Sequence, residues 1–321
     1  MVMTTHFMFE KTEYFHDFVR YYERAKILNL RNIGELPNHV TVGDELQDNV
    51  TIYDTVWRRY AGFSKVLEQL WYGPESWTKR KSEIAYKDVL STEEWLYVCL
   101  IHRLTGSGAS FEEDHGYRNT AVIEMVETNT GIDEYVEFLR NYDKPMFTSK
   151  GNQIPPFNKP RHGYDKGGKE FLCEYAPKLA NHIAQYLSDT SHYRHGIKEL
   201  VDIVLMWMTA NGFKKYHFVL TAWVMDMAEY FPHHVDQDSR VYMGKNCYRS
   251  LDYMFIKPKG LTKHEFYGDA MAELCYTLDN KPYNLEDVLC DAVRYWANYI
   301  PKNYVGTYKN TLSTVERISL N

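Results

Sequence analysis

Apolar residues recur at spacings of three and four positions along most of this chain, and this period constrains the fold more than any other feature. Phe15, Phe18, Val19 and Tyr22 begin the first such stretch, which continues to Ile27. This spacing places the side chains on one face of an α-helix. The same pattern predicts helices over residues 52–71, from 91 to a stop at 106, and over 117–128, 133–142, 171–187, 197–210, 216–231 and 284–300. Convincing strands are few, so the predicted fold class is all-α.

Local signals mark several ends of these helices. Ser91 and Glu94 form a capping box, in which each side chain can satisfy the other residue's backbone N–H. Gly73-Pro74 ends the second helix, and Pro177 interrupts the helix over 171–187. Asn284 is the expected cap of the last helix.

The clearest interruption of the helical pattern lies at residues 143–169, which hold four prolines and four glycines. We expect one large helical domain that comprises two lobes, about 1–145 and 170–321, joined by a basic loop over 146–169. That loop is either a linker or a functional loop that contacts DNA phosphates, with a solvated surface loop as the plain alternative. The basic side chains assigned to DNA here are Lys159, Arg161, Lys166 and Lys169.

Composition limits the function classes. With 44% hydrophobic residues the chain can bury a sizeable core, and a net charge of −6 argues against a non-specific coat on DNA. Aromatic residues make up 15%, which suits a large core or clefts that stack bases. The five cysteines are scattered without a CxxC, and none lies at ligand spacing from a histidine, so no metal or cofactor is expected. Without a long apolar run, the protein is expected to be soluble and cytoplasmic.

The first candidate site is RLTGSGASFEEDHGYRN, residues 103–119. Its small residues expose backbone N–H groups ahead of a new helix, an arrangement that can hold a phosphate or carboxylate. Asp114 next to His115 offers the carboxylate–imidazole pair used in general base catalysis. A glycine helix end followed by a polar turn explains the same residues without any function.

The second candidate site runs from 211 to 251. A turn and an apolar helix lead to Val235-Asp236 and, five residues on, Val241. This layout is similar to helix-hairpin-helix DNA glycosylases, in which a glycine hairpin contacts the DNA backbone and an Asp at the head of the next helix faces an extruded nucleotide. Asn211-Gly212-Phe213-Lys214-Lys215 stands where those enzymes have G-x-G, and no catalytic lysine precedes it. Glycosidic cleavage is therefore doubtful, and an ordinary helix pair with a polar turn fits equally well.

Together with DFVRYYERAKILNLRNIGELPN near the start, these segments resemble the bacteriophage alpha-glutamyl/putrescinyl thymine pyrophosphorylase family, also called amino acid:DNA transferases. The resemblance spans roughly residues 15–255. It implies a helical, DNA-glycosylase-like architecture that transfers an amino acid to the 5-methylene of phosphorylated 5-hydroxymethyluracil and displaces (pyro)phosphate. The implied partners are that DNA, a free amino acid and the phage DNA kinase. The implied location is the host cytoplasm.

The reaction assigns roles to particular residues. His115 is the expected general base, oriented by Asp114, and Asp236 stabilises a cation-like intermediate, with Asp226 as the second choice. Residues expected to bind phosphate or substrate are Arg103, Gly106, Ser107, Gly108, Ser110, Arg118, Asn119, Ser239, Arg240, Asn246 and Arg249; Lys214 and Lys215 join the DNA-binding set. The alternatives are a helix-hairpin-helix DNA glycosylase and a non-catalytic helical nucleic-acid-binding protein.

Overall fold

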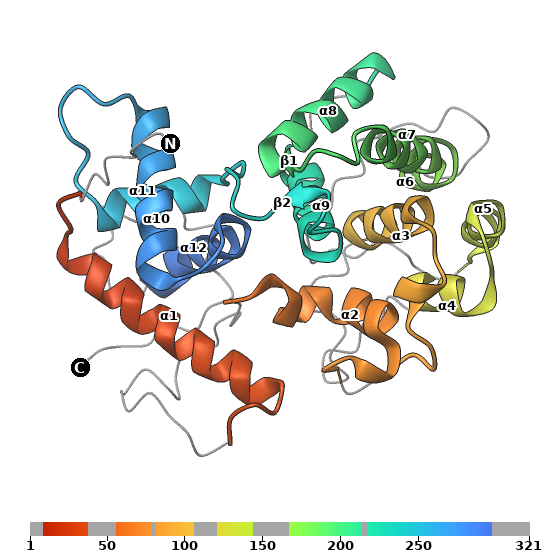
Figure 1. Cartoon of the computed structure of the whole chain (residues 1–321), viewed down its shortest axis with the longest axis horizontal. Coiled ribbons are helices and arrows are strands. Elements are labelled where there is room, and N and C mark those ends of the chain that lie inside the picture. Colours follow the sequence, from red (N-terminus) through yellow and green to blue (C-terminus); the bar gives the residue numbers. More distant parts are fainter. Residues whose placement is uncertain are drawn as a thin grey trace. The chain divides into compact units, whose positions relative to one another are not determined.

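The computed structural model describes residues 9–37, 56–78, 81–105, 121–143, 167–213 and 217–296. These residues are mostly helical, and the only named strands among them are two residues long (Figure 1). The prediction of a helical protein is confirmed at this level.

The chain divides into two compact units. Residues 1–61 and 243–321 form the terminal unit, and residues 62–242 form the central unit. The lobe boundary expected within 146–169 falls inside the central unit, and residues 144–166 lie outside the described part of the chain. The number of folding domains stays a prediction.

The terminal unit is built from helices drawn from both ends of the chain. They are α1 (Glu13–Asn32), the 3-10 turn η2 (Arg58–Tyr60), α10 (Lys245–Met254), α11 (Lys263–Leu278) and α12 (Pro282–Trp296). A shared core of fully buried apolar side chains, including Phe18, Leu251, Phe266 and Leu289, joins these segments. Burial of this apolar surface is what holds the first and last parts of the sequence together.

The central unit surrounds two helices that are buried on nearly every side. Its elements are η3 (Gly62–Ser64), α2 (Lys65–Tyr72), η4 (Gly73–Glu75), η5 (Tyr86–Asp88), α3 (Thr92–Leu104), α4 (Ala121–Thr128), α5 (Ile132–Asn141), α6 (Gly167–Glu170), the π-helical turn η7 (Phe171–Tyr175), α7 (Ala176–Asp189), β1 (His195–Gly196), α8 (Ile197–Ala210), α9 (His217–Tyr230) and β2 (Val235–Asp236). α3 packs against α7 and α9, and α9 packs against α8 (Figure 1). The apolar all-round sequences of α3 and α9 match this central position.

The predicted helix ends are confirmed in part. The Ser91–Glu94 capping box forms, with the Glu94 N–H donating to the Ser91 hydroxyl and the Ser91 N–H donating to the Glu94 carboxylate. Residues 171–187 also change register near Pro177, as expected. The Ala176 N–H bonds to the Phe171 carbonyl five residues back. Pro177 cannot donate to the next carbonyl, that of Leu172, which instead accepts the Tyr97 hydroxyl at 2.6 Å.

Two predictions of helix extent are wrong. Residues 56–64, expected in one helix over 52–71, form extended and 3-10 segments, because side chains from elsewhere take their backbone donors: the N–H groups of Val56 and Arg58 bond to Asn29 and Asn284. Asn284 is likewise not an N-cap. α12 begins two residues earlier at Pro282, and proline is favoured at the first position of a helix. The Asn284 side chain instead accepts from the Arg58 N–H and donates to Asn280.

Candidate functional sites

Many of the predicted site residues lie outside the described residues. They are Gly106, Ser107, Gly108, Ser110, Asp114, His115, Arg118 and Asn119 of the first candidate site, Lys159, Arg161 and Lys166 of the basic loop, and Lys214 and Lys215 of the hairpin. Their roles stay predictions. Lys169 is described, and its ammonium donates to the Tyr142 carbonyl at the end of α5.

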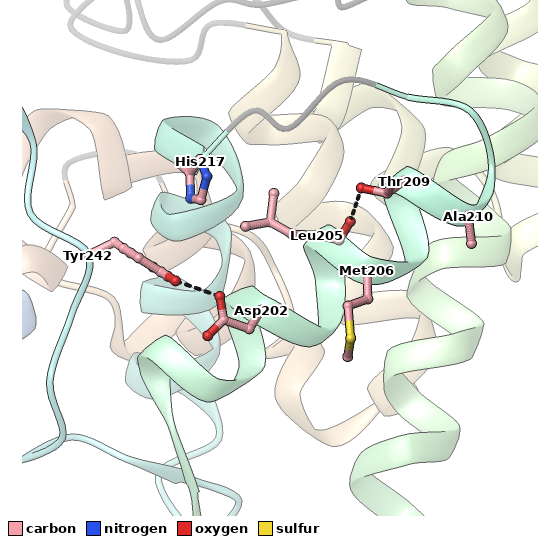
Figure 2. A pocket seen from close by; sticks show the side chains of 7 residues that line it. All are labelled: Asp202, Leu205, Met206, Thr209, Ala210, His217 and Tyr242. Carbon is pink, nitrogen blue, oxygen red and sulfur yellow. Dashed lines mark hydrogen bonds between the residues drawn. The ribbon is translucent and has the colours of Figure 1, made fainter.

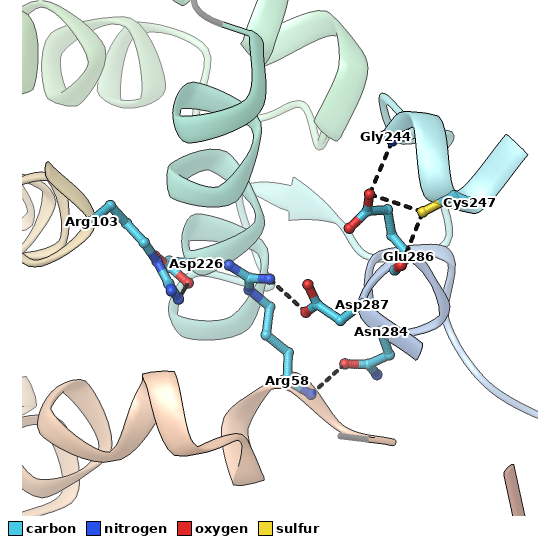
Figure 3. A network of polar contacts seen from close by, with 8 residues as sticks. All are labelled: Arg58, Arg103, Asp226, Gly244, Cys247, Asn284, Glu286 and Asp287. Atoms are coloured by element: carbon cyan, nitrogen blue, oxygen red, sulfur yellow. Dashed lines mark hydrogen bonds and ion pairs between the residues drawn. The ribbon is translucent and has the colours of Figure 1, made fainter. Parts of the chain in front are cut away.

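Arg103 and Asp226, assigned to phosphate binding and catalysis, form a buried ion pair between α3 and α9. The guanidinium donates through Nε and Nη2 to both carboxylate oxygens, each at 2.5 Å (Figure 3). The two side chains are only 3% and 2% exposed. A bidentate ion pair of this kind compensates both charges inside the core. The pair joins α3 to α9 and anchors the end of α3 just before the segment 106–120. The phosphate-binding role of Arg103 and the catalytic role of Asp226 stay predictions.

The surroundings of this pair are polar and aromatic. The Phe63 ring lies 4.8 Å from the Arg103 guanidinium, a cation–π contact. Burial, and then the charge of Asp226, raises the pKa of the Cys99 thiol well above its usual value. Burial, and then Glu68, does the same for the pKa of Tyr230, whose hydroxyl donates to Glu68 at 3.4 Å. The thiol and the hydroxyl near the buried pair therefore stay neutral.

Asp236 has a different environment, since its carboxylate is 39% exposed and lies 3.6 Å from Arg194. Its backbone belongs to β2, which pairs in parallel with β1, so that Asp236 lies opposite Gly196 at the start of α8. Ser239 completes this turn: its hydroxyl donates to the Asp236 carbonyl at 2.6 Å and accepts from the Ile197 N–H at 2.8 Å. Ser239 therefore caps α8 from about forty residues away, a role that local sequence rules do not reveal.

The position of Asp236 differs from the glycosylase layout. In that layout the Asp stands at the head of the next helix, whereas here α10 begins only at Lys245, after a turn and a segment without regular secondary structure. Arg240 lies on this segment with its side chain exposed, and its carbonyl accepts from the Lys198 N–H. Asp236, Ser239 and Arg240 are thus held beside the first turn of α8.

The turn after α8 explains the NGF sequence in structural terms. Gly212 has φ +82°, its N–H bonds to the Thr209 carbonyl, and the Phe213 N–H bonds to the Met208 carbonyl. This is a Schellman helix end, in which glycine supplies the left-handed residue. The Asn211 N–H bonds to Trp207. All three N–H groups are therefore used within the turn, and in this conformation none of them can donate to a DNA phosphate.

A cleft of about 590 Å³ lies beside this turn (Figure 2). Asp202, Leu205, Met206 and Thr209 of α8 line it, together with His217 of α9 and Tyr242. The Tyr242 hydroxyl donates to the Asp202 carboxylate at 2.5 Å, and the Tyr242 and His217 rings meet edge to face at 5.1 Å. The sequence predictions named none of its lining residues. The sequence did hold one signal for them: Asp202, Leu205, Met206 and Thr209 are spaced i, i+3, i+4 and i+7, which places them on one face of a helix.

The terminal unit holds a second buried polar network (Figure 3). Arg58, 2% exposed, pairs with Asp287 at 2.6 Å. Next to Asp287, the buried Glu286 accepts from the Gly244 N–H at 3.0 Å and from the Cys247 thiol at 3.1 Å, which ties α12 to the start of α10. Burial, and then the charge of Asp287, raises the pKa of Glu286 to about 7.

The remaining two predicted residues also belong to the terminal unit. Asn246 donates to the Cys290 sulfur at 3.5 Å, and Arg249 is half-buried on α10. Asn246 and Arg249 thus belong to the terminal unit, whereas Asp236 and Ser239 belong to the central unit.

Two kinds of feature are absent from the described residues. No three His, Cys, Asp or Glu side chains in this part of the chain cluster as metal ligands would. None of the described helices is long and apolar enough to cross a membrane. In comparisons with known protein families, curated proteins and solved structures, nothing matches this chain.

Proposed function

We propose that this protein modifies a pyrimidine in DNA, transferring an amino acid to the 5-methylene of phosphorylated 5-hydroxymethyluracil. The amine nitrogen forms a bond to the methylene carbon, the carbon–oxygen bond breaks, and (pyro)phosphate leaves with the electron pair. The proton lost by the amine passes to His115, oriented by Asp114. The proposal rests on the sequence resemblance and on one observation in the described residues, the accessible carboxylate of Asp236.

The Asp236 carboxylate suits a role next to an electron-deficient carbon. It is 39% exposed, so a substrate can approach it, and the β1–β2 pair and the Ser239 turn fix its backbone. A preorganised carboxylate stabilises developing positive charge without reorganising during the reaction. Of the two carboxylates considered, Asp236 is therefore preferred over the fully paired Asp226.

The decisive experiment incubates the full-length protein with duplex DNA that contains phosphorylated 5-hydroxymethyluracil and a pool of amino acids. The DNA is then digested and its nucleosides are weighed by mass spectrometry. We expect a thymidine derivative heavier by one amino acid residue, with the backbone intact. Free base with abasic sites would identify a glycosylase instead, and DNA that is bound but chemically unchanged would identify a binding protein.

A further inference from the structure

Three histidines gather where the turn after α9 meets the first turn of α8. Residues 195–198 and 233–240, which we call the clasp, are joined there by the β1–β2 pair. Three backbone N–H groups donate across the clasp at 2.8–3.1 Å, those of His195, Ile197 and Lys198. The clasp therefore fixes the turn that carries Asp236.

One of these histidines, His234, has no acceptor for a second ring proton. Its ring is half-buried, and its Nδ1 atom is buried without a hydrogen-bond partner among the described residues. A neutral imidazole can carry its one proton on Nε2, whereas an imidazolium carries a proton on Nδ1 as well. A buried donor without an acceptor costs free energy, so the closed clasp disfavours the charged form of His234.

The two other histidines add to this cost. The exposed His233 ring lies 4.2 Å from the His234 ring. His195 has an acceptor at each ring nitrogen when it is protonated, the Glu199 carboxylate at 3.1 Å and the Thr190 hydroxyl oxygen at 2.7 Å. Burial, and then the charges of His233 and His195, lowers the pKa of His234 below its ordinary value of 6.5.

The clasp also has acidic neighbours, but they have partners of their own. The other titratable or charged groups on the elements that pack here are Tyr186 of α7, Arg194 before β1, Glu199 of α8, Glu229 and Tyr230 of α9 and Asp236 of β2. Glu199 bonds to His195, and Asp236 lies 3.6 Å from Arg194. The remaining charges of the clasp are on side chains that are at least partly exposed, those of Lys198, Asp238 and Arg240.

We propose that the clasp is a pH-sensitive switch, closed while His234 is neutral and opened when His234 takes up a proton in mild acid. Opening breaks the β1–β2 pair and releases the turn that holds Asp236 and Ser239. The switch itself does not depend on the reaction proposed above. Its consequence, regulation of Asp236 as a reactive group, rests on that proposed function.

The direction of the switch follows from the proton balance. The closed clasp binds a proton on His234 less tightly than the open clasp does, so acid favours the open form. Above the ordinary pKa of 6.5 neither form binds this proton, and the balance between the two forms does not change with pH. Below that value the closed form loses up to about tenfold per pH unit, until the lowered pKa is reached.

Hydrogen–deuterium exchange of the full-length protein, measured by mass spectrometry at about pH 7.5 and pH 5.5, reports the opening. Urea-unfolded protein at each pH supplies the intrinsic exchange rates, and peptides from α3 are the internal reference. We expect the protection of peptides that contain the N–H groups of His195, Ile197 and Lys198 to fall severalfold, by up to about tenfold. Protection of α3 should change by less than about twofold.

The matched variants are His234→Gln and His182→Gln, each of which removes one imidazole from the central unit. His182 is exposed on α7. We expect His234→Gln to abolish the fall in protection and His182→Gln to keep it. His233→Gln is a third variant, at an exposed position that tolerates the change, and it removes one charge next to His234. Its fall in protection should be smaller than that of wild type.

Two results would overturn the proposal. One is equal protection of the clasp peptides at the two pH values in wild type, and the other is a wild-type fall in both His234→Gln and His233→Gln. If His234→Gln leaves the clasp unprotected at both pH values, the comparison of His233→Gln with wild type decides. A failed transfer assay leaves the switch standing, and absence of the switch leaves the transfer assay valid.

Discussion

At the scale of single residues, the described acidic side chains that bear on function fall into two groups. Asp226 and Glu286 are buried and held by several donors, whereas Asp202 and Asp236 reach solvent and keep unused acceptor capacity. A buried ion pair affects the stability of a fold, whereas a carboxylate that reaches solvent can contact a substrate. The four residues stand in similar apolar or mixed stretches, so the sequence alone does not separate the two groups.

The Arg103–Asp226 pair should be essential for stability. Removing one partner leaves an unpaired charge in the core, so Asp226→Ala and Arg103→Ala should each lower the free energy of unfolding by about 3–5 kcal/mol. The double variant Arg103→Met/Asp226→Leu should lose much less, because no buried charge remains. Urea unfolding measures all three. The exposed Arg140–Glu137 pair is the control, and Arg140→Ala should change stability by less than about 1 kcal/mol.

Glu286 should make stability depend on pH near neutrality. Because its pKa is raised to about 7 in the folded protein, the folded state holds the proton more tightly than the unfolded chain. The contribution of the protonated group is complete below the unfolded pKa and is lost as the pH rises through about 7. In Glu286→Gln this loss should vanish, so the variant should gain stability relative to wild type between about pH 5 and pH 8.

Urea unfolding at several pH values measures this slope, and Glu265→Gln is the control. Glu265 caps α11 at the surface, and hydrogen bonds from Thr262 lower its pKa. Its contribution is present above the unfolded pKa and is lost only as the pH falls through the lowered value. Glu265→Gln should therefore keep the wild-type slope between about pH 5 and pH 8. The same slope in wild type and Glu286→Gln would contradict the assignment.

At the scale of elements, several helices were predictable from the spacing or density of their apolar residues, and α3, α5, α8 and α9 lie within a few residues of their predicted bounds. Where prediction failed, long-range contacts decided the outcome: Asn29 and Asn284 take the donors of Val56 and Arg58 and break the second helix. α11 was missed although Thr262 and Glu265 form the same capping box as Ser91 and Glu94, a signal that was present in the sequence.

The glycine in the turn after α8 should be important for stability. Gly212 has φ +82°, and an added Cβ would meet no atom within 4 Å, so the cost of Gly212→Ala is that of the left-handed backbone alone, about 1–2 kcal/mol. Gly212→Asn should lose less, because asparagine tolerates this conformation better. Chemical unfolding of the two variants measures the difference. Equal losses would show that Gly212 is not held in the left-handed region.

At the scale of the whole molecule, the helical class followed from periodicity, but the assembly of the terminal unit did not. Its core joins Phe18 near the start of the chain to Leu289 near its end, and single-sequence patterns contain no information on such pairings. The candidate site was predictable only as a set of residue types. Asp236 and Ser239 do lie together, but the cap that Ser239 supplies to α8 and the burial of Arg103 depend on contacts with distant residues, which the sequence alone does not show.

The central claim is that Asp236 serves a reaction on a DNA base, and nucleoside mass spectrometry of DNA treated with variant proteins tests it most directly. Asp236→Asn and the neighbouring Asp238→Asn, which lies in the same turn, are compared with wild type on phosphorylated 5-hydroxymethyluracil DNA with amino acids. We predict that wild type and Asp238→Asn add an amino acid to the base and that Asp236→Asn, folded as judged by circular dichroism, loses at least about 100-fold in rate. Full transfer by Asp236→Asn, or no transfer by wild type, would contradict the account.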